Sequence, residues 1–238
     1  MNNNNDKTIG DIFNNLAKDN KKLNNKIIIK DADQKDSSMM ETKLTYSKLS
    51  YDLTKQISKE DKKNNGIYFT PPLTINKNIN FLKPYMKNIT EVLEPSCGSC
   101  EYILELNKQY KHVNITGIEL NKTIFETIEN LQNEQIKIYN ENFLLYKHDK
   151  KYDLILGNPP YFVMNKKDVP SLYYEYFDGR PNIFILFLIK SLKLLKNNGI
   201  LSFVLPKNFI NCLYYDKTRK FINDNFIRSE EHTSELQS

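Results

Sequence analysis

The tetrapeptide Asn158-Pro159-Pro160-Tyr161 directly follows an apolar run from Tyr152 to Leu156. Its two prolines remove two backbone N–H donors, so the segment offers mainly carbonyl acceptors. Asn158 adds a side-chain acceptor and Tyr161 adds a flat aromatic ring. This combination suits a site that grips an exocyclic amino group on a planar base. The four residues fit an ordinary proline-rich turn equally well, so the surrounding elements must decide.

Polar and small residues also follow each of the three preceding apolar runs. Glu94-Pro95-Ser96-Cys97-Gly98-Ser99 precedes a helix, where small residues let a ligand approach backbone N–H groups. Glu119 ends the second run, and its carboxylate can accept hydrogen bonds from both hydroxyls of a ribose. Asn142 and Phe143 follow the third run and offer an amide and a ring to an adenine. Each feature alone has a structural explanation, but together they predict an adenosine-shaped site.

Strands and helices alternate regularly from Gly66 onward. Helices are expected near 101–109, 123–132 and 182–196, with a further one beginning near Tyr214. A long loop covers 162–181. Strands are expected over residues 91–94, 113–120, 136–139, 152–156 and 200–205. This alternation predicts an α/β fold with a doubly wound, Rossmann-like parallel sheet.

The region before Gly66 has a different composition. Residues 1–40 are rich in Asn and Lys and are expected to form a disordered arm, although they contain a short apolar run at Ile27–Ile29. Residues 41–65 are expected to form a helix and a polar linker over 59–65. The helix follows from the spacing of its apolar residues, Tyr46, Leu49, Leu53 and Ile57.

Composition bounds the class of protein. A length of 238 residues permits one sizeable domain, and a net charge of +5 permits a polyanionic partner without requiring one. Three cysteines without a signal peptide predict a reducing, cytoplasmic location. The longest apolar run, 183–189, is too short to span a membrane. Cys97 and Cys100 form a C-x-x-C, but no further ligands have suitable spacing, so no metal site is predicted.

The chain resembles the adenine-N6-specific DNA methyltransferases that use S-adenosylmethionine, of the NPPY type with the cofactor region first. This group includes the methylase part of fused restriction–modification enzymes. The match spans about Gly66 to Ile227, and Gly199–Phe209 looks like the family's fifth strand and its exit. Four stretches carry the resemblance: Gly66-Ile67-Tyr68-Phe69-Thr70-Pro71-Pro72, Val92-Leu93-Glu94-Pro95-Ser96-Cys97-Gly98-Ser99, Gly117-Ile118-Glu119 and Asp153-Leu154-Ile155-Leu156-Gly157-Asn158-Pro159-Pro160-Tyr161.

The resemblance implies S-adenosylmethionine as cofactor, double-stranded DNA as partner, and no metal. It implies that Glu119 binds the ribose, and that Asn142 and Phe143 contact the cofactor adenine. The catalytic tetrapeptide would hold a flipped-out adenine, with Phe209 as a candidate for the second stacking ring and core packing as its equal alternative. The implied methionine pocket consists of Tyr68, Thr70, Glu94, Ser96 and Gly98.

Two residues depart from the family's pattern. Cys100 stands where the family usually has Gly, and its side chain is expected to crowd the cofactor loop. Asn142 stands where the family usually has Asp, which changes the polarity of one hydrogen bond to an adenine. Both departures bear on cofactor affinity rather than on the fold.

The last residues, 228–238, are polar and aperiodic, and they read as translated sequencing adapter rather than native protein. A genuine polar tail is the alternative. The catalytic domain, 66–227, is then expected to be incomplete, without its last two strands and a target-recognition domain. Such a chain would expose the edge of its fifth strand and methylate DNA poorly or not at all.

Three other functions remain open at this stage. The same tetrapeptide would serve a protein glutamine-N5 methyltransferase of the release-factor type, or a ribosomal RNA guanine-N2 methyltransferase. An inactive DNA-binding fragment is the non-enzymatic alternative. The segment Tyr68–Pro72 and the form of the 94–99 loop favour DNA.

Overall fold

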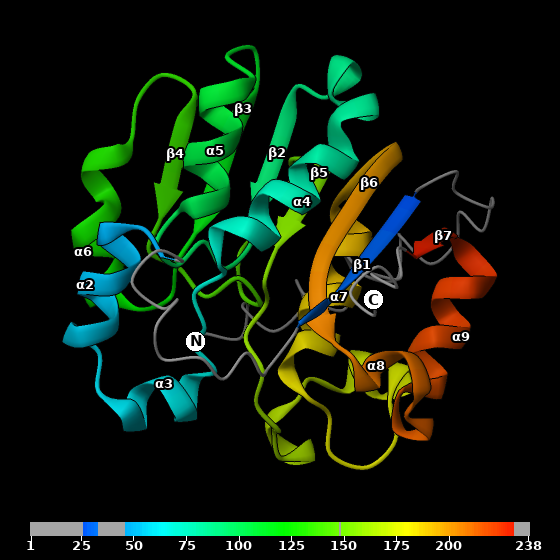
Figure 1. The fold of residues 1–238 in the computed structure, drawn as a ribbon. Helices are drawn as coiled ribbons and strands as arrows, with labels where there is room; N and C mark the ends of the chain where they lie inside the picture. Colours follow the sequence, from blue (N-terminus) through cyan, green and yellow to red (C-terminus); the bar gives the residue numbers. More distant parts are fainter. Residues whose placement is uncertain (1–25, 33–45, 148, 231–238) are drawn as a thin grey trace, which may run out of the picture.

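The computed structural model describes residues 26–32, 46–147 and 149–230. Seven strands form one sheet in the order β4-β3-β2-β5-β6-β1-β7, and all neighbours run parallel (Figure 1). The predicted parallel α/β class is confirmed. The five expected strands are all present, as β2 (Glu91–Glu94), β3 (Asn114–Ile118), β4 (Ile136–Tyr139), β5 (Tyr152–Gly157) and β6 (Leu195–Pro206).

Both faces of the sheet are covered, because neighbouring apolar residues on one strand enter different cores. Leu154 of β5 packs in one cluster and Ile155 in the other. Strands buried on both sides read as continuous apolar runs, which is the pattern of β5. The first face lies under α2 (Lys48–Gln56), α4 (Pro72–Leu82), α5 (Glu101–Gln109) and α6 (Lys122–Ile128). The second lies under α7 (Ile183–Leu194) and α9 (Asp216–Asn225) (Figure 1).

Short helices join these elements. The α-helix α8 (Asn208–Asn211) follows β6, and the remaining turns are 3-10 helices. None of the helices within the described ranges is long and apolar enough to cross a membrane. The 3-10 helices are η1 (Lys83–Asn88), η2 (Glu129–Leu131), η3 (Lys166–Asp168), η4 (Ser171–Tyr176) and η5 (Leu213–Tyr215).

The stretch 46–65 differs from expectation in one element. The amphipathic helix is confirmed as α2, with Leu53 fully buried. The polar stretch expected to be a linker is instead α3 (Lys59–Asn65). Ser58 caps its start by accepting the Asp61 N–H at 3.0 Å, and Gly66 ends it at φ +60°. Since no α3 residue is buried, its caps rather than an apolar face define it.

A strand within the Asn- and Lys-rich arm is the main correction. Residues 1–40 were expected to be disordered, but Lys26–Ala32 form β1 between β6 and the edge strand β7 (Ile227–Glu230). Successive β-branched isoleucines have high strand propensity, which explains the location of β1. The expectation of an exposed edge at the fifth strand was therefore wrong. Residues 228–230 belong to β7, although 228–238 were expected to be an aperiodic tail. The rest of the arm and residues 231–238 lie outside the described residues.

Candidate functional site

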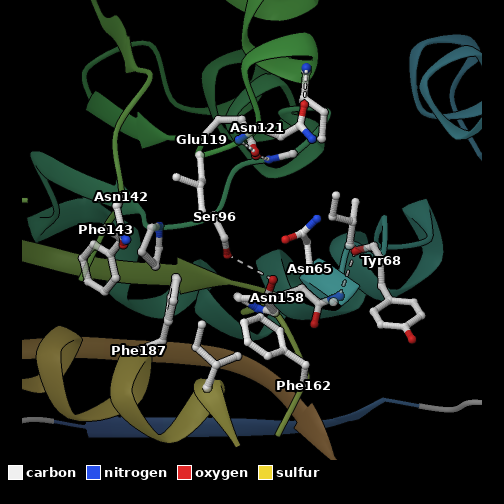
Figure 2. Close-up of a pocket in the computed structure, with 18 of the residues that line it drawn as sticks. Asn65, Tyr68, Ser96, Glu119, Asn121, Asn142, Phe143, Asn158, Phe162 and Phe187 are labelled. Atoms are coloured by element: carbon white, nitrogen blue, oxygen red, sulfur yellow. Dashed lines mark hydrogen bonds between the residues drawn. The ribbon is translucent and has the colours of Figure 1, made fainter. Parts of the chain in front are cut away.

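The carboxyl ends of β2 to β5 surround a cavity of about 350 Å³ (Figure 2). A smaller cavity of about 30 Å³ adjoins it, and the two share Tyr68, Ser96, Gly98 and Asn158 among their walls. Open α/β sheets bind ligands at this edge. Most of the predicted residues are thus brought together, whereas Pro159 and Tyr161 line neither cavity. Glu119, Asn142, Phe143 and Pro160 line the larger cavity, and Thr70 and Glu94 line the smaller one.

Glu119 is held by two backbone amides at the end of β3. Its Oε2 accepts the Gly98 N–H at 2.9 Å, and its Oε1 accepts the Asn121 N–H at 2.7 Å. Burial raises the pKa of Glu119 to about 6, against the lowering effect of these hydrogen bonds. The group is therefore an oriented carboxylate at neutral pH, with lone pairs left for further donors.

Glu94 ends β2 and presents a carboxyl oxygen with no partner. The residue is 3% exposed, and its Oε2 has no hydrogen bond within the described part of the chain. Burial raises the pKa of Glu94 well above its usual range, and neighbouring acidic groups raise it further. An unsatisfied buried oxygen facing a cavity calls for an explanation, and a bound cationic donor supplies one.

Asn158 is fixed by contacts with two separate segments and with Tyr161 of its own tetrapeptide. Ser96 Oγ donates to its backbone carbonyl at 3.1 Å, a contact drawn in Figure 2, and its Nδ2 donates to Tyr68 O at 3.4 Å. Its Oδ1 accepts a hydrogen bond from the Tyr161 hydroxyl. The amide oxygen keeps a second lone pair for another donor. The tetrapeptide is thereby attached to both walls of the smaller cavity before any ligand enters.

The Tyr161 ring is half-buried beside Asn158. Its hydroxyl also lies 2.6 Å from the Val204 carbonyl of β6, and its ring meets Phe184 edge-on at 6.0 Å between centroids. The centroid of the exposed Tyr68 ring lies 6.2 Å from that of Tyr161, and the two ring planes are inclined by 35°. Burial raises the pKa of Tyr161, which keeps the phenol neutral. These contacts fix the plane of the ring behind Asn158; Tyr161 lines neither cavity, so its role as a stacking ring stays a prediction.

Gly66 brings the start of the Tyr68–Pro72 segment against the tetrapeptide. Its φ is +60°, and a Cβ at this position would lie 2.6 Å from the Tyr161 backbone nitrogen. No side chain fits at that distance from a backbone atom. Glycine is thus required here both by conformation and by contact.

We expect Gly66→Ala to lower the free energy of unfolding by about 2 kcal/mol, because it combines a left-handed backbone with a clash. Gly179→Ala is the matched control, since Gly179 has φ +63° but faces only the Tyr214 ring at 3.4 Å. Its loss should be about 1 kcal/mol, from the backbone conformation alone. Urea denaturation measures both. Equal losses would show that the contact with Tyr161 contributes nothing.

Two predictions about individual side chains are corrected. Phe209 is fully buried between Phe184 and Tyr215 and lines neither cavity, so its prediction as a stacking ring was wrong. Cys100 adopts φ +60°, a conformation that favours glycine, but its side chain points into the core. It lines neither cavity, so the expected crowding of the cofactor loop does not occur.

Asn142 stabilises the turn after β4. Its Oδ1 accepts the Leu144 N–H at 2.9 Å. An asparagine side chain that bonds its own backbone two residues on is a common turn device. The departure from Asp thus leaves the loop intact while the residue still lines the larger cavity.

The cavity walls also contain residues that sequence reasoning missed. Asn121 and Phe162 lie just beyond predicted positions, so the strand-end rule applied over a longer window would have found them. Phe187 comes from the interior of α7, whose uniform apolar sequence marks no position as special. Within the described residues, no group of three or more His, Cys, Asp or Glu could hold a metal ion. The other missed residues include Asn65, Ile67, Phe69, Leu120, Ile124, Met164 and Ile183.

Comparison with known proteins gives matches of three kinds. The Eco57I restriction-modification methylase model matches residues 3–235. The modification methylase CviBIII of Paramecium bursaria Chlorella virus NC1A is 35% identical over 183 residues, covering 74% of this chain and 47% of that protein. The type II methyltransferase M.AccI of Acinetobacter calcoaceticus is 31% identical over 173 residues, covering 68% and 32%.

A solved structure supports the fold. A protein described as a class I S-adenosylmethionine-dependent methyltransferase from Listeria monocytogenes superposes with a TM-score of 0.55 at 15% identity. The superposition covers 74% of this chain and 56% of that one. The chain spans about half the length of the viral methylase and less of the bacterial one. The family model covers nearly all of it, and the chain therefore belongs to the Eco57I restriction-modification methylase family.

Proposed function

We propose that this chain is the catalytic region of a DNA methyltransferase that moves a methyl group from S-adenosylmethionine to N6 of a flipped-out adenine. The observation that carries the proposal is the pair of adjoining cavities, with a buried carboxyl group in each and Asn158 lining both. The relatives are named as a modification methylase and a type II methyltransferase, which supports the same reaction.

The cavities match the two ends of this cofactor. In the larger one, Glu119 would accept the ribose hydroxyls, and the turn at Asn142 and Phe143 would border the adenine. In the smaller one, the unpartnered Glu94 oxygen would receive the methionine ammonium. Tyr68, Thr70, Ser96 and Gly98 complete the wall around it.

The tetrapeptide supplies the chemistry at the base. An adenine within a duplex is out of reach, so it must be flipped into the site. Tyr161 would stack on its face, and the free lone pair of Asn158 Oδ1 with the Pro159 carbonyl would accept the N6 hydrogens. When bound, the cofactor supplies the methyl, whose C–S bond breaks as the N–C bond forms, and the N6 proton passes to water. The residues contribute orientation rather than a nucleophile.

Other planar amino groups could meet the same acceptors, namely a glutamine amide or a guanine amine. Labelled methyl transfer to DNA, RNA and release factor separates these alternatives from adenine methylation. The expected slow reaction of this chain with DNA stays a prediction. Tritium transfer to duplex DNA at an ordinary rate would contradict it.

The cofactor site is tested by calorimetry of S-adenosylmethionine with the chain. Glu119→Ala should weaken binding about ten-fold, because the ribose hydroxyls lose their charged acceptor. Glu126→Ala is the control, since Glu126 is a half-exposed carboxylate of α6 that pairs with Lys122 outside the cavity. Equal binding by Glu119→Ala and the wild type would count against the assignment. Absence of binding by the wild type would overturn the proposed function.

A further inference from the structure

Lys190 is a cation in the buried interior of a mostly apolar stretch of α7. Ten successive residues of this helix, Ile183–Leu192, are buried, and Lys190 is 7% exposed. A buried ammonium is costly unless its hydrogens are accepted. Burial lowers the pKa of Lys190 to about 8, with Glu141 opposing the shift, so the group is still mostly charged at neutral pH. Something in the structure must compensate for its desolvation.

The partners of Lys190 all belong to the loop after β4. Its Nζ donates to the Phe143 carbonyl and to the Tyr146 carbonyl, the latter at 2.7 Å. The same ammonium lies 5.0 Å from the centroid of the Phe143 ring, within cation–π range. One side chain from a different element thus holds the carbonyl edge of this loop at two points.

The opposite side of that loop shapes the larger cavity. Asn142, Phe143 and Leu144 line it, and the Phe143 ring packs on Phe187 of α7 at 5.0 Å between centroids. Figure 2 shows Asn142, Phe143 and Phe187 gathered at one end of the cavity. Any outward movement of the loop would widen that end. Lys190 itself does not line the cavity, so it acts on the cavity only through the loop.

We infer that Lys190 is a positioning residue, which sets the loop 142–146 at the distance needed to bind the adenine end of the cofactor. This inference rests on the proposed function. It assigns the effect to one end of the ligand. The affinity for the adenosine half should depend on Lys190, and the affinity for the methionine half should not.

The test is Lys190→Met, which keeps an unbranched apolar stem in the core but leaves both carbonyls without their charged donor. Calorimetry would use two ligands, S-adenosylmethionine and 5′-methylthioadenosine, which lacks the amino-acid end. We expect both to bind about ten-fold more weakly, the scale of one lost charge-assisted hydrogen bond. Lys193→Met is the matched control. Lys193 belongs to the same helix as Lys190 but lies over the Tyr176 ring of η4, so the variant should bind both ligands with the affinity of the wild type.

Thermal unfolding of each variant separates positioning from folding, since a purely structural role would lower Tm without changing affinity. Unchanged affinity in Lys190→Met, or a loss confined to S-adenosylmethionine, would overturn the inference alone. A wild type that binds neither ligand would overturn the proposed function, and this inference with it.

If Lys190→Met fails to fold, Lys190→Gln replaces it. Wild-type affinity in Lys190→Gln would overturn the inference, because the shorter side chain cannot reach both carbonyls. Failure of both variants to fold would make the residue a core requirement and would also overturn it.

Discussion

Replacing Asn158 by alanine is expected to lower the rate of methyl transfer about a thousand-fold, the scale of removing one preorganised polar group from a transition state. The side-chain oxygen is already oriented by Tyr161, and the backbone carbonyl by Ser96. Under the proposed mechanism, the variant loses the acceptor that draws the amino hydrogens of the base out of its plane. Single-turnover transfer of tritium from labelled cofactor, with protein in excess, measures the ratio of rates even if both are slow.

The control for this change is Asn165→Ala. Asn165 is an exposed asparagine on the loop that follows the tetrapeptide, and it lines neither cavity. Its variant should transfer methyl at the wild-type rate. Cofactor affinity of Asn158→Ala should stay within about three-fold of the wild type, because Asn158 is expected to stabilise the transition state rather than the bound cofactor. Transfer by Asn158→Ala within a factor of ten of the wild type would refute the assigned role.

Glu94→Gln is expected to weaken S-adenosylmethionine binding about thirty-fold, since a buried charge pair loses one partner. The amide keeps the size of the side chain, so the 30 Å³ cavity retains its shape. Binding of 5′-methylthioadenosine, which has no ammonium, should stay unchanged. Glu101→Gln is a weaker control. Glu101 already accepts a hydrogen bond from Ser50 at 2.5 Å, so this change also disturbs a contact within the protein. Equal losses of affinity for both ligands would show that Glu94 does not act on the ammonium of the cofactor.

The raised pKa of Glu94 makes the same interaction pH-dependent. In the free protein the carboxyl holds its proton to higher pH than usual, whereas a bound ammonium favours the carboxylate. Binding therefore releases a proton, and affinity rises with pH, with Glu119 adding to the effect around its pKa of about 6. Calorimetry in buffers with different ionisation enthalpies counts the protons released. Glu94→Gln should release fewer, and an equal number would contradict this account.

Sequence periodicity and the strand-end rule were sufficient to predict the central sheet and the position of the site. Local patterns determine where a strand such as β5 begins and ends, and parallel strands bring their carboxyl ends together. Glu94, Glu119 and Asn158 could therefore be located from spacing and resemblance alone. Their surroundings were harder to predict, because each contact depends on elements that are distant in the chain.

The missed features share that dependence on tertiary structure. Phe209 could not be distinguished from a stacking ring until Phe184 and Tyr215 were seen to enclose it. The role of Lys190 depends on carbonyls that lie in a loop more than forty positions earlier. The helix α3 is a different case, since the Ser58 to Asp61 capping signal was present in the sequence and its polar composition obscured it.

The position of β1 has a consequence for how the chain assembles. Lys26 pairs with Ile200 and also with Ile227, so the first described strand acquires its neighbours only after nearly all of the chain is available. Closing so long a loop is slow, because its entropy is lost before the pairing compensates for it. The two strands beyond β6 should thus dock last, on a preformed five-stranded body. The residues described as lining the two cavities lie between Asn65 and Phe187, so they belong to the body that forms before this edge closes.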